Sequence, residues 1–418
     1  MKTSDFKTNA NSFQAVTVPG LERISLLLAK LGNPEKRLKF IHVAGTNGKG
    51  SVSANIACIL EDAGLKVGKY ISPNLIRVNE RISISGEDIS DSALSEILNL
   101  IEPLSKEVEN ELGIPPTQFE IWTAAAFLYF EREKCDIVVL EVGLGGEFDA
   151  TNVIDGNEIA IITRLGIDHT GYLGNTISEI ASAKAGIIKS KSATGKVITV
   201  RQTDGALRVI EQRAKEKGVS LIVADPVPCA VSGVHEIFDI DGIKKIECGI
   251  PGYHQIENAS LATLAARELG VDEKYIRSGI KRAKNPARFE LIRENPTVIY
   301  DGGHNENGIE ALVSSLKRYF GNAEKTVIFA CMSDKDITES LKMLSYSDTE
   351  FIYTTVKDNP RALGAKALSK KALALGYGGT YFESIGEAYR EALLKNKLTV
   401  ICGSLYLYKD FTEECLNK

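Results

Sequence analysis

Residues 40–51 read FIHVAGTNGKGS: an apolar strand, a glycine-rich turn with one lysine, and the start of a helix. In such a turn backbone N–H groups converge on phosphate oxygens, and the helix N-terminus adds positive potential. Lys49 is placed to reach the terminal phosphates and Ser51 to touch Mg²⁺. A tight βα turn alone would need neither side chain, so the run predicts a nucleotide phosphate loop. The predicted loop residues are Gly45, Thr46, Asn47, Gly48, Lys49, Gly50 and Ser51.

Short β-branched runs alternate with helical patterns along most of the chain, which is typical of parallel sheets with crossover helices. The pattern pauses near Asn285-Pro286 and then begins a second alternating series. We therefore predict an α/β protein with a P-loop ATPase domain at 1–287 and a smaller Rossmann-like domain at 288–418. The stretch from Cys229 to Cys248 alternates around Asp241-Gly242, which predicts an antiparallel hairpin appended to the first sheet.

Composition excludes several classes of protein. The chain has 418 residues, 44% of them hydrophobic and 25% charged, with a formal net charge of −5 and no basic run, so nucleic acid and anionic membranes are not expected partners. The seven cysteines include no C-x-x-C pair, which argues against a zinc ribbon or a disulfide framework. The polar segment 1–14 lacks the apolar core of a signal peptide, and a cytoplasmic protein is expected.

Polar residues follow three of the predicted strands. Glu141 follows strand 136–140, and the glycines after it do not form a dinucleotide-binding fingerprint, because Phe148 stands where G-x-G-x-x-G needs glycine. His169 follows strand 159–163, and Ser72 follows strand 66–71. Ligands of open α/β sheets bind at the carboxyl ends of the strands, so these groups are candidates to hold Mg²⁺ beside the phosphate loop. By contrast, His42 lies within its strand and is expected to be a core histidine.

The phosphate loop, with PGLER at 19–23 and LGNP at 31–34 before it, resembles that of the folylpolyglutamate synthase/dihydrofolate synthase family of the Mur-ligase superfamily. The resemblance spans the whole chain. It implies that Ser72, Glu141 and His169, together with Ser51, bind Mg²⁺, and that two ions are present. It also implies that Lys184 is an N6-carboxylysine, whereas the local pattern alone makes Lys184 a solvated helix residue.

The same resemblance assigns further residues to ATP and to the pteridine substrate. Asn258, Arg288 and Asp301 would contact ATP, although from the sequence alone Arg288 could form a linker salt bridge and Asp301 a helix cap. Phe119 and Phe148 could offer flat apolar faces to a ring or belong to the core. The implied catalytic residues are Lys49, Lys184 and His169. The implied substrate-binding residues are Val18, Pro19, Gly20, Leu21, Thr117, Gln118, Phe119, Glu120, Phe148, Asp149 and Ala150.

The implied activity is an ATP- and Mg²⁺-dependent ligase that adds L-glutamate to dihydropteroate, to folate γ-glutamyl tails, or to both, through an acyl phosphate. The partners are then ATP, glutamate and a folate-type acceptor, and the protein is expected to be a monomer. Glu147 departs from the family pattern, which has arginine at this position, and so bears on substrate preference. Two alternatives stay open: a Mur-type ligase for another carboxylate acceptor, and a P-loop kinase or nucleotide switch.

Overall fold

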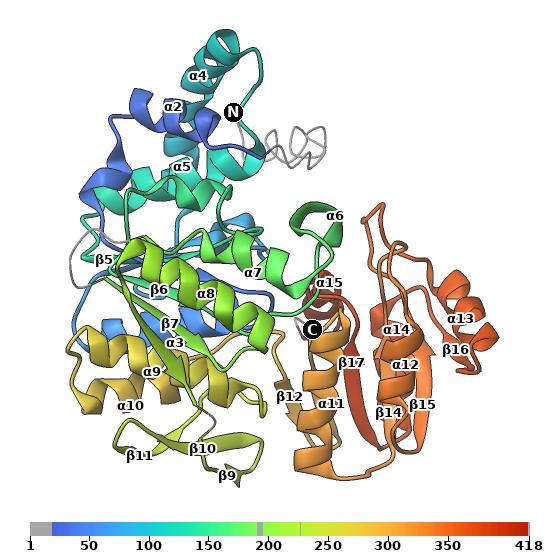
Figure 1. Cartoon of the computed structure of the whole chain (residues 1–418). Coiled ribbons are helices and arrows are strands. Elements are labelled where there is room, and N and C mark those ends of the chain that lie inside the picture. Colours follow the sequence, from blue (N-terminus) through green and yellow to red (C-terminus); the bar gives the residue numbers. More distant parts are fainter. Residues whose placement is uncertain (1–18, 190–194, 226, 417–418) are drawn as a thin grey trace. The chain divides into compact units, whose positions relative to one another are not determined.

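The structure is a computed structural model that describes residues 19–189, 195–225 and 227–416 (Figure 1). The predicted substrate contact of Val18 lies outside these residues. The chain divides into two compact units. The first unit comprises the chain up to Val227, Ile240–Ile243 and Glu257–Ala283; the second comprises Pro228–Asp239, Lys244–Ile256 and Lys284–Lys418.

The first unit is built on an eight-stranded sheet in the order β4-β3-β2-β5-β1-β6-β7-β8. Neighbouring strands from β2 to β8 pair in parallel, whereas β3 and β4 form an antiparallel edge. The strands are β1 (Phe40–Ala44), β2 (Val67–Tyr70), β3 (Ile82–Ile84), β4 (Glu87–Asp88), β5 (Ile137–Glu141), β6 (Ile159–Ile162), β7 (Lys196–Val200) and β8 (Ser220–Ala224). The predicted parallel sheet is confirmed. Strands β3 and β4 are not predicted from the sequence, because strands this short carry no periodic signal.

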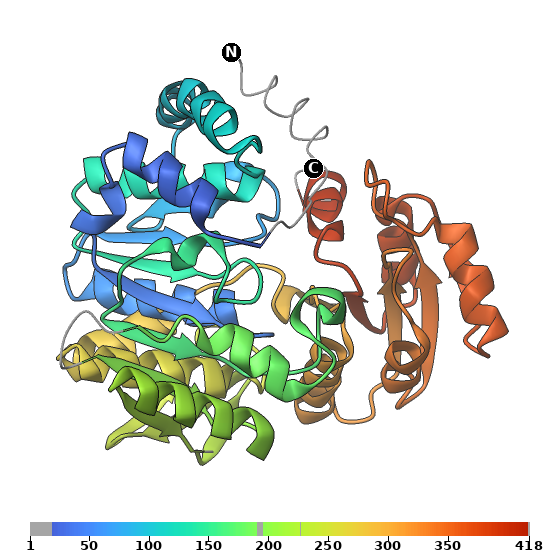
Figure 2. The same cartoon turned by 45° about the horizontal axis from the view of Figure 1, so that its top comes forward.

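Helices cover both faces of this sheet, as the views in Figures 1 and 2 show. Phe40 packs with the core under α2, α4 and α5, and Ala44 with the core under α7 and α8, so these helices share one face. Helix α3 packs against α10. The helices are α2 (Glu22–Lys30), α3 (Lys49–Asp62), α4 (Asp91–Leu112), α5 (Gln118–Arg132), α6 (Thr170–Leu173), α7 (Ile177–Ala185), α8 (Asp204–Lys217), α9 (Gln255–Glu268) and α10 (Glu273–Arg282).

Strand β1 occupies the middle of the sheet and has all five residues buried. Its neighbours β5 and β6 are consecutive strands of the sheet that lie on opposite sides of it, which makes β1 a topological switch point. In open α/β sheets, ligands bind at the carboxyl edge beside such a point. The strand order therefore places a binding crevice where the phosphate loop begins.

The segment predicted as a hairpin appended to the first sheet forms a sheet of its own. Its order is β11-β10-β9, and Asp241-Gly242 makes the expected tight turn, with both residues at positive φ. The strands are β9 (Cys229–Ser232), β10 (His235–Ile240) and β11 (Ile243–Glu247). The prediction of attachment to the first sheet is wrong because the carboxylate of Glu236, which is fully buried, is bound by side chains of the second unit.

The second unit contains a six-stranded sheet in the order β12-β13-β17-β14-β15-β16, parallel except for the antiparallel β12–β13 pair. The strands are β12 (Glu290–Glu294), β13 (Thr297–Tyr300), β14 (Lys325–Phe329), β15 (Thr349–Tyr353), β16 (Gly379–Tyr381) and β17 (Leu398–Cys402). The helices are α11 (Glu306–Phe320), α12 (Thr338–Leu344), α13 (Ala365–Ala374), α14 (Ile385–Leu394) and α15 (Leu407–Phe411). This confirms the predicted second α/β domain.

Helix α11 holds the three-stranded sheet through polar contacts. Arg318 Nη2 donates to Glu236 Oε2 at 2.8 Å, and the hydroxyl of Tyr319 donates to Glu236 Oε1 at 2.8 Å. Arg318 also lies over the ring of Tyr253. A buried carboxylate needs such partners, because an uncompensated charge in the interior is costly.

None of the helices within 19–189, 195–225 and 227–416 combines the length and the apolar character that a membrane crossing requires.

We predict that Glu236→Gln loosens the three-stranded sheet by about 2 kcal/mol, since Arg318 loses its charged partner. Amide hydrogen exchange of peptides from β9 to β11 measures this directly. Glu339→Gln is the matched control, because Glu339 forms an exposed pair with Lys342 at 3.1 Å and such pairs contribute little. Unchanged protection in Glu236→Gln would contradict the role given to the buried pair.

Candidate active site

The phosphate loop is held against the end of β6. The backbone N–H groups of Thr46 and Asn47 donate to the Arg164 carbonyl at 3.2 and 3.4 Å. The Thr163 hydroxyl donates to the Asn47 carbonyl at 2.6 Å, and the Thr46 hydroxyl exchanges hydrogen bonds with Gly166. The loop is thus fixed to the neighbouring strand end.

Two glycines of the loop are required by its geometry. Gly45 has a φ of 154°, and a Cβ there would lie 1.8 Å from Thr163 Oγ1. Gly48 has a φ of 91°, and a Cβ there would lie 2.3 Å from Asn258 Oδ1. Both positions therefore exclude a side chain. The second contact also shows that Asn258, in the first turn of α9, lies directly beside the loop.

Lys49 and Lys184 converge on one carbonyl oxygen of the loop. Lys49 Nζ donates to the carbonyls of Gly45 and Thr46 at 3.1 and 3.3 Å, and Lys184 Nζ donates to the carbonyl of Gly45 at 2.9 Å. Burial, and then the charge of Lys49, lowers the pKa of Lys184 to about 7. The two lysines give the loop a concentrated positive potential.

The local pattern around Lys184 predicted a solvated helix residue, and that prediction is wrong. The residue is only 4% exposed. Helix α7 packs closely on the loop after β5: the N–H of Glu147 donates to the Ala183 carbonyl at 2.8 Å, and Gly146 leaves no room for a Cβ against the backbone of Lys184. Tertiary packing therefore buries a cation that the helical periodicity would expose.

Adjacent strand ends carry the predicted metal ligands. Strand β5 pairs with β1 so that Glu141 is level with Val43, and β2 pairs with β5 so that Ser72 follows at the same edge. Ser51 and Glu141 are 3% and 4% exposed. Hydroxyl and carboxylate oxygens are the donors that Mg²⁺ prefers, so these residues fit an ion that is completed by phosphate oxygens and water.

His169 differs from the other predicted ligands. Its side chain is 54% exposed, its φ is positive, and its ring nitrogen Nε2 lies 3.8 Å from the Asp168 carboxylate. In the part of the chain that the structure describes, no three His, Cys, Asp or Glu side chains gather into a metal site of their own.

The predicted substrate residues fall into two groups. Thr117 caps helix α5, and Glu120 accepts from the Thr117 N–H at 2.6 Å and from buried Arg23 at 3.0 Å. Phe119 packs on Tyr70 and closes the space above Gly143. Gln118 lies between them, and Pro19, Gly20 and Leu21 precede α2. This arrangement joins the start of α5 to the loop that follows β5.

The second group lies on that loop. The Asp149 carboxylate is buried and accepts from the N–H groups of Leu144 and Thr151 at 2.8 and 3.0 Å. Ala150 is buried behind it, whereas the Phe148 side chain is exposed. Phe148 is therefore a surface aromatic rather than a core residue.

His42 belongs to the core and supports this loop. Its Nε2 lies 2.9 Å from Thr151 Oγ1, and the Thr151 hydroxyl in turn donates to Asp149. Burial lowers the pKa of His42 to about 3, so the ring is neutral. Since the hydroxyl proton is used by Asp149, His42 Nε2 must carry the proton that it shares with Thr151. The sequence did not indicate this chain of hydrogen bonds.

Arg288 and Asp301 lie in the second unit. Asp301 accepts from the N–H groups of Phe289 and Gly303 at 2.8 and 2.7 Å. Burial raises the pKa of Asp301, and the positive charge of Arg288 opposes that shift. Asp301 is not the cap of α11, because Asn305 occupies that position.

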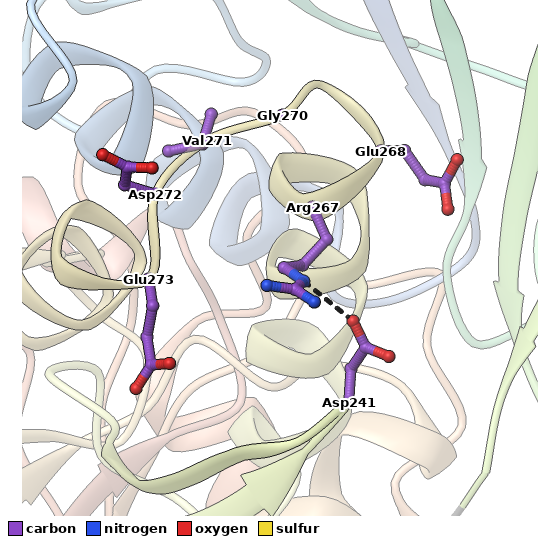
Figure 3. A pocket seen from close by; sticks show the side chains of 7 residues that line it. All are labelled: Asp241, Arg267, Glu268, Gly270, Val271, Asp272 and Glu273. Atoms are coloured by element: carbon purple, nitrogen blue, oxygen red, sulfur yellow. Dashed lines mark hydrogen bonds and ion pairs between the residues drawn. The ribbon is translucent and has the colours of Figure 1, made fainter.

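One pocket of about 360 Å³ lies at the turn between α9 and α10 (Figure 3). Arg267 and Asp241 form an ion pair across it at 3.0 Å, and Glu268 binds Lys196 at 3.1 Å. Lys196 is the first residue of β7, whereas the phosphate loop follows the last residue of β1. The pocket thus lies at the opposite edge of the parallel sheet from the predicted phosphate loop.

Three supporting residues were not among the predicted site residues: Thr163 and Arg164, which hold the phosphate loop, and Thr151, which supports the loop after β5. The sequence offers one sign of such a role, because Thr163 and Arg164 lie at the end of a predicted strand, as the predicted phosphate loop does. Nothing in their spacing distinguishes a loop anchor from an ordinary surface residue.

Comparisons with known proteins agree with this geometry. Residues 43–266 match the Mur ligase middle domain, and residues 287–405 match the Mur ligase glutamate ligase domain. The dihydrofolate synthase/folylpolyglutamate synthase of Bacillus subtilis is 37% identical over 409 residues, which cover 94% of both chains. The protein of the same name from Escherichia coli is 34% identical, with 93% of this chain and 89% of the relative covered.

Solved structures give the same result. Mycobacterium tuberculosis folylpolyglutamate synthase complexed with ADP has a TM-score of 0.91 at 28% identity and covers 99% of this chain and 98% of its own. Escherichia coli FolC in complex with DHPP and ADP has a TM-score of 0.85 at 30% identity and covers 99% and 97%. The match to two Mur ligase domains, together with relatives that extend over nearly the whole chain, shows that this protein belongs to the dihydrofolate synthase/folylpolyglutamate synthase family of Mur ligases.

Proposed function

We propose that this protein adds L-glutamate to dihydropteroate, to the γ-glutamyl tail of folates, or to both, with hydrolysis of ATP to ADP and phosphate. The observation that carries the proposal is the anchored phosphate loop, with Lys49 and Lys184 at one carbonyl and Glu141 at the adjacent strand end. The names of the relatives supply the class of acceptor. In this proposal residues 1–287 bind ATP and the folate, and residues 288–418 form the glutamate ligase domain.

The reaction consists of two displacements. An oxygen of the acceptor carboxylate attacks the γ-phosphorus of ATP, ADP leaves, and an acyl phosphate forms. The amine of glutamate then attacks the acyl carbon, phosphate leaves, and an amide forms. Neither displacement needs a nucleophilic side chain, so the protein contributes by positioning reactants and offsetting negative charge.

Different residues of the site bind different parts of the nucleotide. The loop 45–51 receives the phosphates, and Lys49 moves from its carbonyl partners to the terminal phosphate. Asn258, Arg288 and Asp301 hold the rest of the nucleotide, while His169 assists at the reacting phosphate.

Mg²⁺, of which we propose two ions, would offset charge on the transferring phosphoryl group. Ser51, Ser72 and Glu141 would hold the ions, with His169 as the additional ligand. The proposed acceptor site consists of Val18 to Leu21, Thr117 to Glu120, and Phe148 to Ala150, in which exposed Phe148 offers its ring face to the pteridine. Glu147 beside it is exposed, and its charge bears on which acceptor is preferred.

We also propose that Lys184 is N-carboxylated. The ammonium first loses a proton; the neutral Nζ then attacks the carbon of CO₂ and loses a second proton, so that a carbamate anion replaces a cation. A pKa of about 7 makes this reaction accessible near neutral pH, because a large fraction of the amine is then unprotonated. The carbamate would supply a further oxygen ligand beside the phosphate loop. The enzyme is proposed to act as a monomer in the cytoplasm.

The direct test incubates the purified protein with Mg-ATP, L-glutamate and either dihydropteroate or tetrahydrofolate. We expect ADP release that depends on glutamate, and a product larger by one glutamyl residue in mass spectrometry. ADP release with no glutamylated product from either acceptor would remove the folate assignment and favour another Mur-type acceptor. ADP release without any amine would favour the kinase or switch alternative.

Gly48→Ala is predicted to abolish nucleotide binding, since its Cβ would lie 2.3 Å from Asn258 Oδ1 and displace that side chain. Gly64→Ala is a matched control at the other end of α3: its φ is 90°, against 91° at Gly48, and no atom lies within 4 Å of its Cβ. Both substitutions should cost about 1 kcal/mol of stability through the strained φ. Equal ADP affinity of the two variants in calorimetry would refute the proposed contact.

Carboxylation of Lys184 predicts a carbamate carbon signal in ¹³C NMR after addition of ¹³C-bicarbonate. At fixed dissolved CO₂ the signal should grow as pH rises from 6 to 8 through the Lys184 pKa of about 7, because the reactive amine is the deprotonated form. The signal should vanish in Lys184→Met and persist in Lys325→Met, which removes a lysine that is also buried, with its pKa lowered to about 8. A signal that survives in Lys184→Met would place the carbamate elsewhere.

A further inference from the structure

Arg164 contacts the phosphate loop and helix α9 at the same time. Its carbonyl accepts from the N–H groups of Thr46 and Asn47. Its guanidinium binds both carboxylate oxygens of Glu257, with Nε 3.1 Å from Oε2 and Nη2 on Oε1. A third donor, Nη1, lies 2.9 Å from the Arg201 carbonyl, beyond β7. One residue thus joins the loop after β1, the end of β6 and the first turn of α9.

Glu257 directly precedes Asn258, the residue whose side chain lies beside Gly48. Asn258 is 5% exposed, and the space above Gly48 is closed by its Oδ1. A small rotation or shift of the first turn of α9 would therefore move this carboxamide relative to the phosphate loop. The Arg164–Glu257 pair ties this turn to the strand end that holds the loop.

We propose that the Arg164–Glu257 ion pair is a positioning device for the nucleotide: it sets the register of α9 against the phosphate loop, so that Asn258 meets ATP in the right place. The proposal rests on the proposed ATP site. Arg164 and Glu257 are positioning residues in this account, since they act through the loop and through Asn258 and touch neither the phosphates nor the reacting atoms.

The chemistry of the pair supports a geometric role rather than a contribution to global stability. The side chains of Arg164 and Glu257 are 44% and 42% exposed, and ion pairs of this exposure add little to folding. A two-pronged arginine–carboxylate contact nevertheless fixes direction as well as distance, which a single lysine contact cannot do. Small displacements of groups that position a substrate can reduce turnover strongly.

The test is a charge-reversal cycle on the full-length protein. Arg164→Glu and Glu257→Arg each place like charges together, and each is expected to raise the Kd for ADP and the KM for ATP by roughly tenfold, a typical size for a directly coupled pair. The KM for the folate acceptor should stay near that of wild type. The double variant Arg164→Glu/Glu257→Arg restores opposite charges and should recover most of the loss.

The experiment also includes a milder set of substitutions and a control variant. If a charge-reversal variant fails to fold, a milder cycle is available with Arg164→Gln, Glu257→Gln and their double variant. Thermal unfolding shows whether each variant is folded. Arg132→Ala is the matched control: Arg132 forms an exposed pair with Glu96 at 3.0 Å, away from the phosphate loop, and should leave nucleotide binding unchanged.

Single variants with wild-type nucleotide affinity would overturn the proposal. So would a double reversal no better than the weaker single variant, because an Arg164 that contacted phosphate directly could not be replaced by an arginine at position 257. Failure of the wild-type protein itself to bind ADP would instead count against the proposed function. The positioning role of the ion pair and the proposed function are therefore contradicted by different observations.

Discussion

The close approach of the phosphate loop to the end of β6 is the constraint on which the site depends. Gly45 meets Thr163 where no side chain fits, and the next two N–H groups donate to Arg164. This contact requires β1 and β6 to be neighbours in a parallel sheet, since only then do both carboxyl ends reach the same edge. The central position of β1 and the glycine at position 45 are thus two aspects of one geometric requirement.

The anchored loop in turn determines the electrostatics of the site. Its carbonyl at Gly45 accepts from both lysines, and α7 brings Lys184 there by packing on the loop after β5. A buried ammonium is costly, and burial accordingly lowers the pKa of Lys184 to about 7. A bound polyphosphate or a carbamate would relieve it by supplying negative charge. The buried ammonium of Lys184, which is unfavourable in the folded protein, therefore favours the binding of an anionic substrate.

Rigidity around the loop comes from buried polar chains rather than from apolar packing alone. His42, Thr151 and Asp149 connect the middle of β1 to the loop after β5, and Glu120 connects the start of α5 to Arg23 on α2. The His42–Thr151 and Arg23–Glu120 contacts join residues from distant parts of the sequence, whereas Thr151 and Asp149 are neighbours in the chain. Such networks fix one arrangement, because any other leaves a buried polar group without a partner.

In the second unit, a polar contact rather than proximity in the sequence determines where the β9–β11 sheet packs. The β9–β11 segment follows the first sheet in sequence, and its turn at Asp241-Gly242 is encoded locally. Its attachment is not local: Glu236 is fully buried and finds its partners on α11, more than 80 residues away. The prediction that it extends the first sheet failed because hairpin chemistry specifies a turn and a register, but not the surface on which the hairpin packs.

The sequence by itself determined the alternating α/β architecture, the phosphate loop, the strand-end position of Glu141 and the family. These features depend on periodicity, on glycine at positions that exclude a Cβ, and on a chain of motifs in a set order, all of which are local or sequential. Only the tertiary structure decided that Lys184 is buried against Gly45, that Arg164 links the loop to α9, and that Phe148 is exposed. Burial, pKa and contacts between distant residues follow from packing, because they depend on which surfaces meet after the chain has folded.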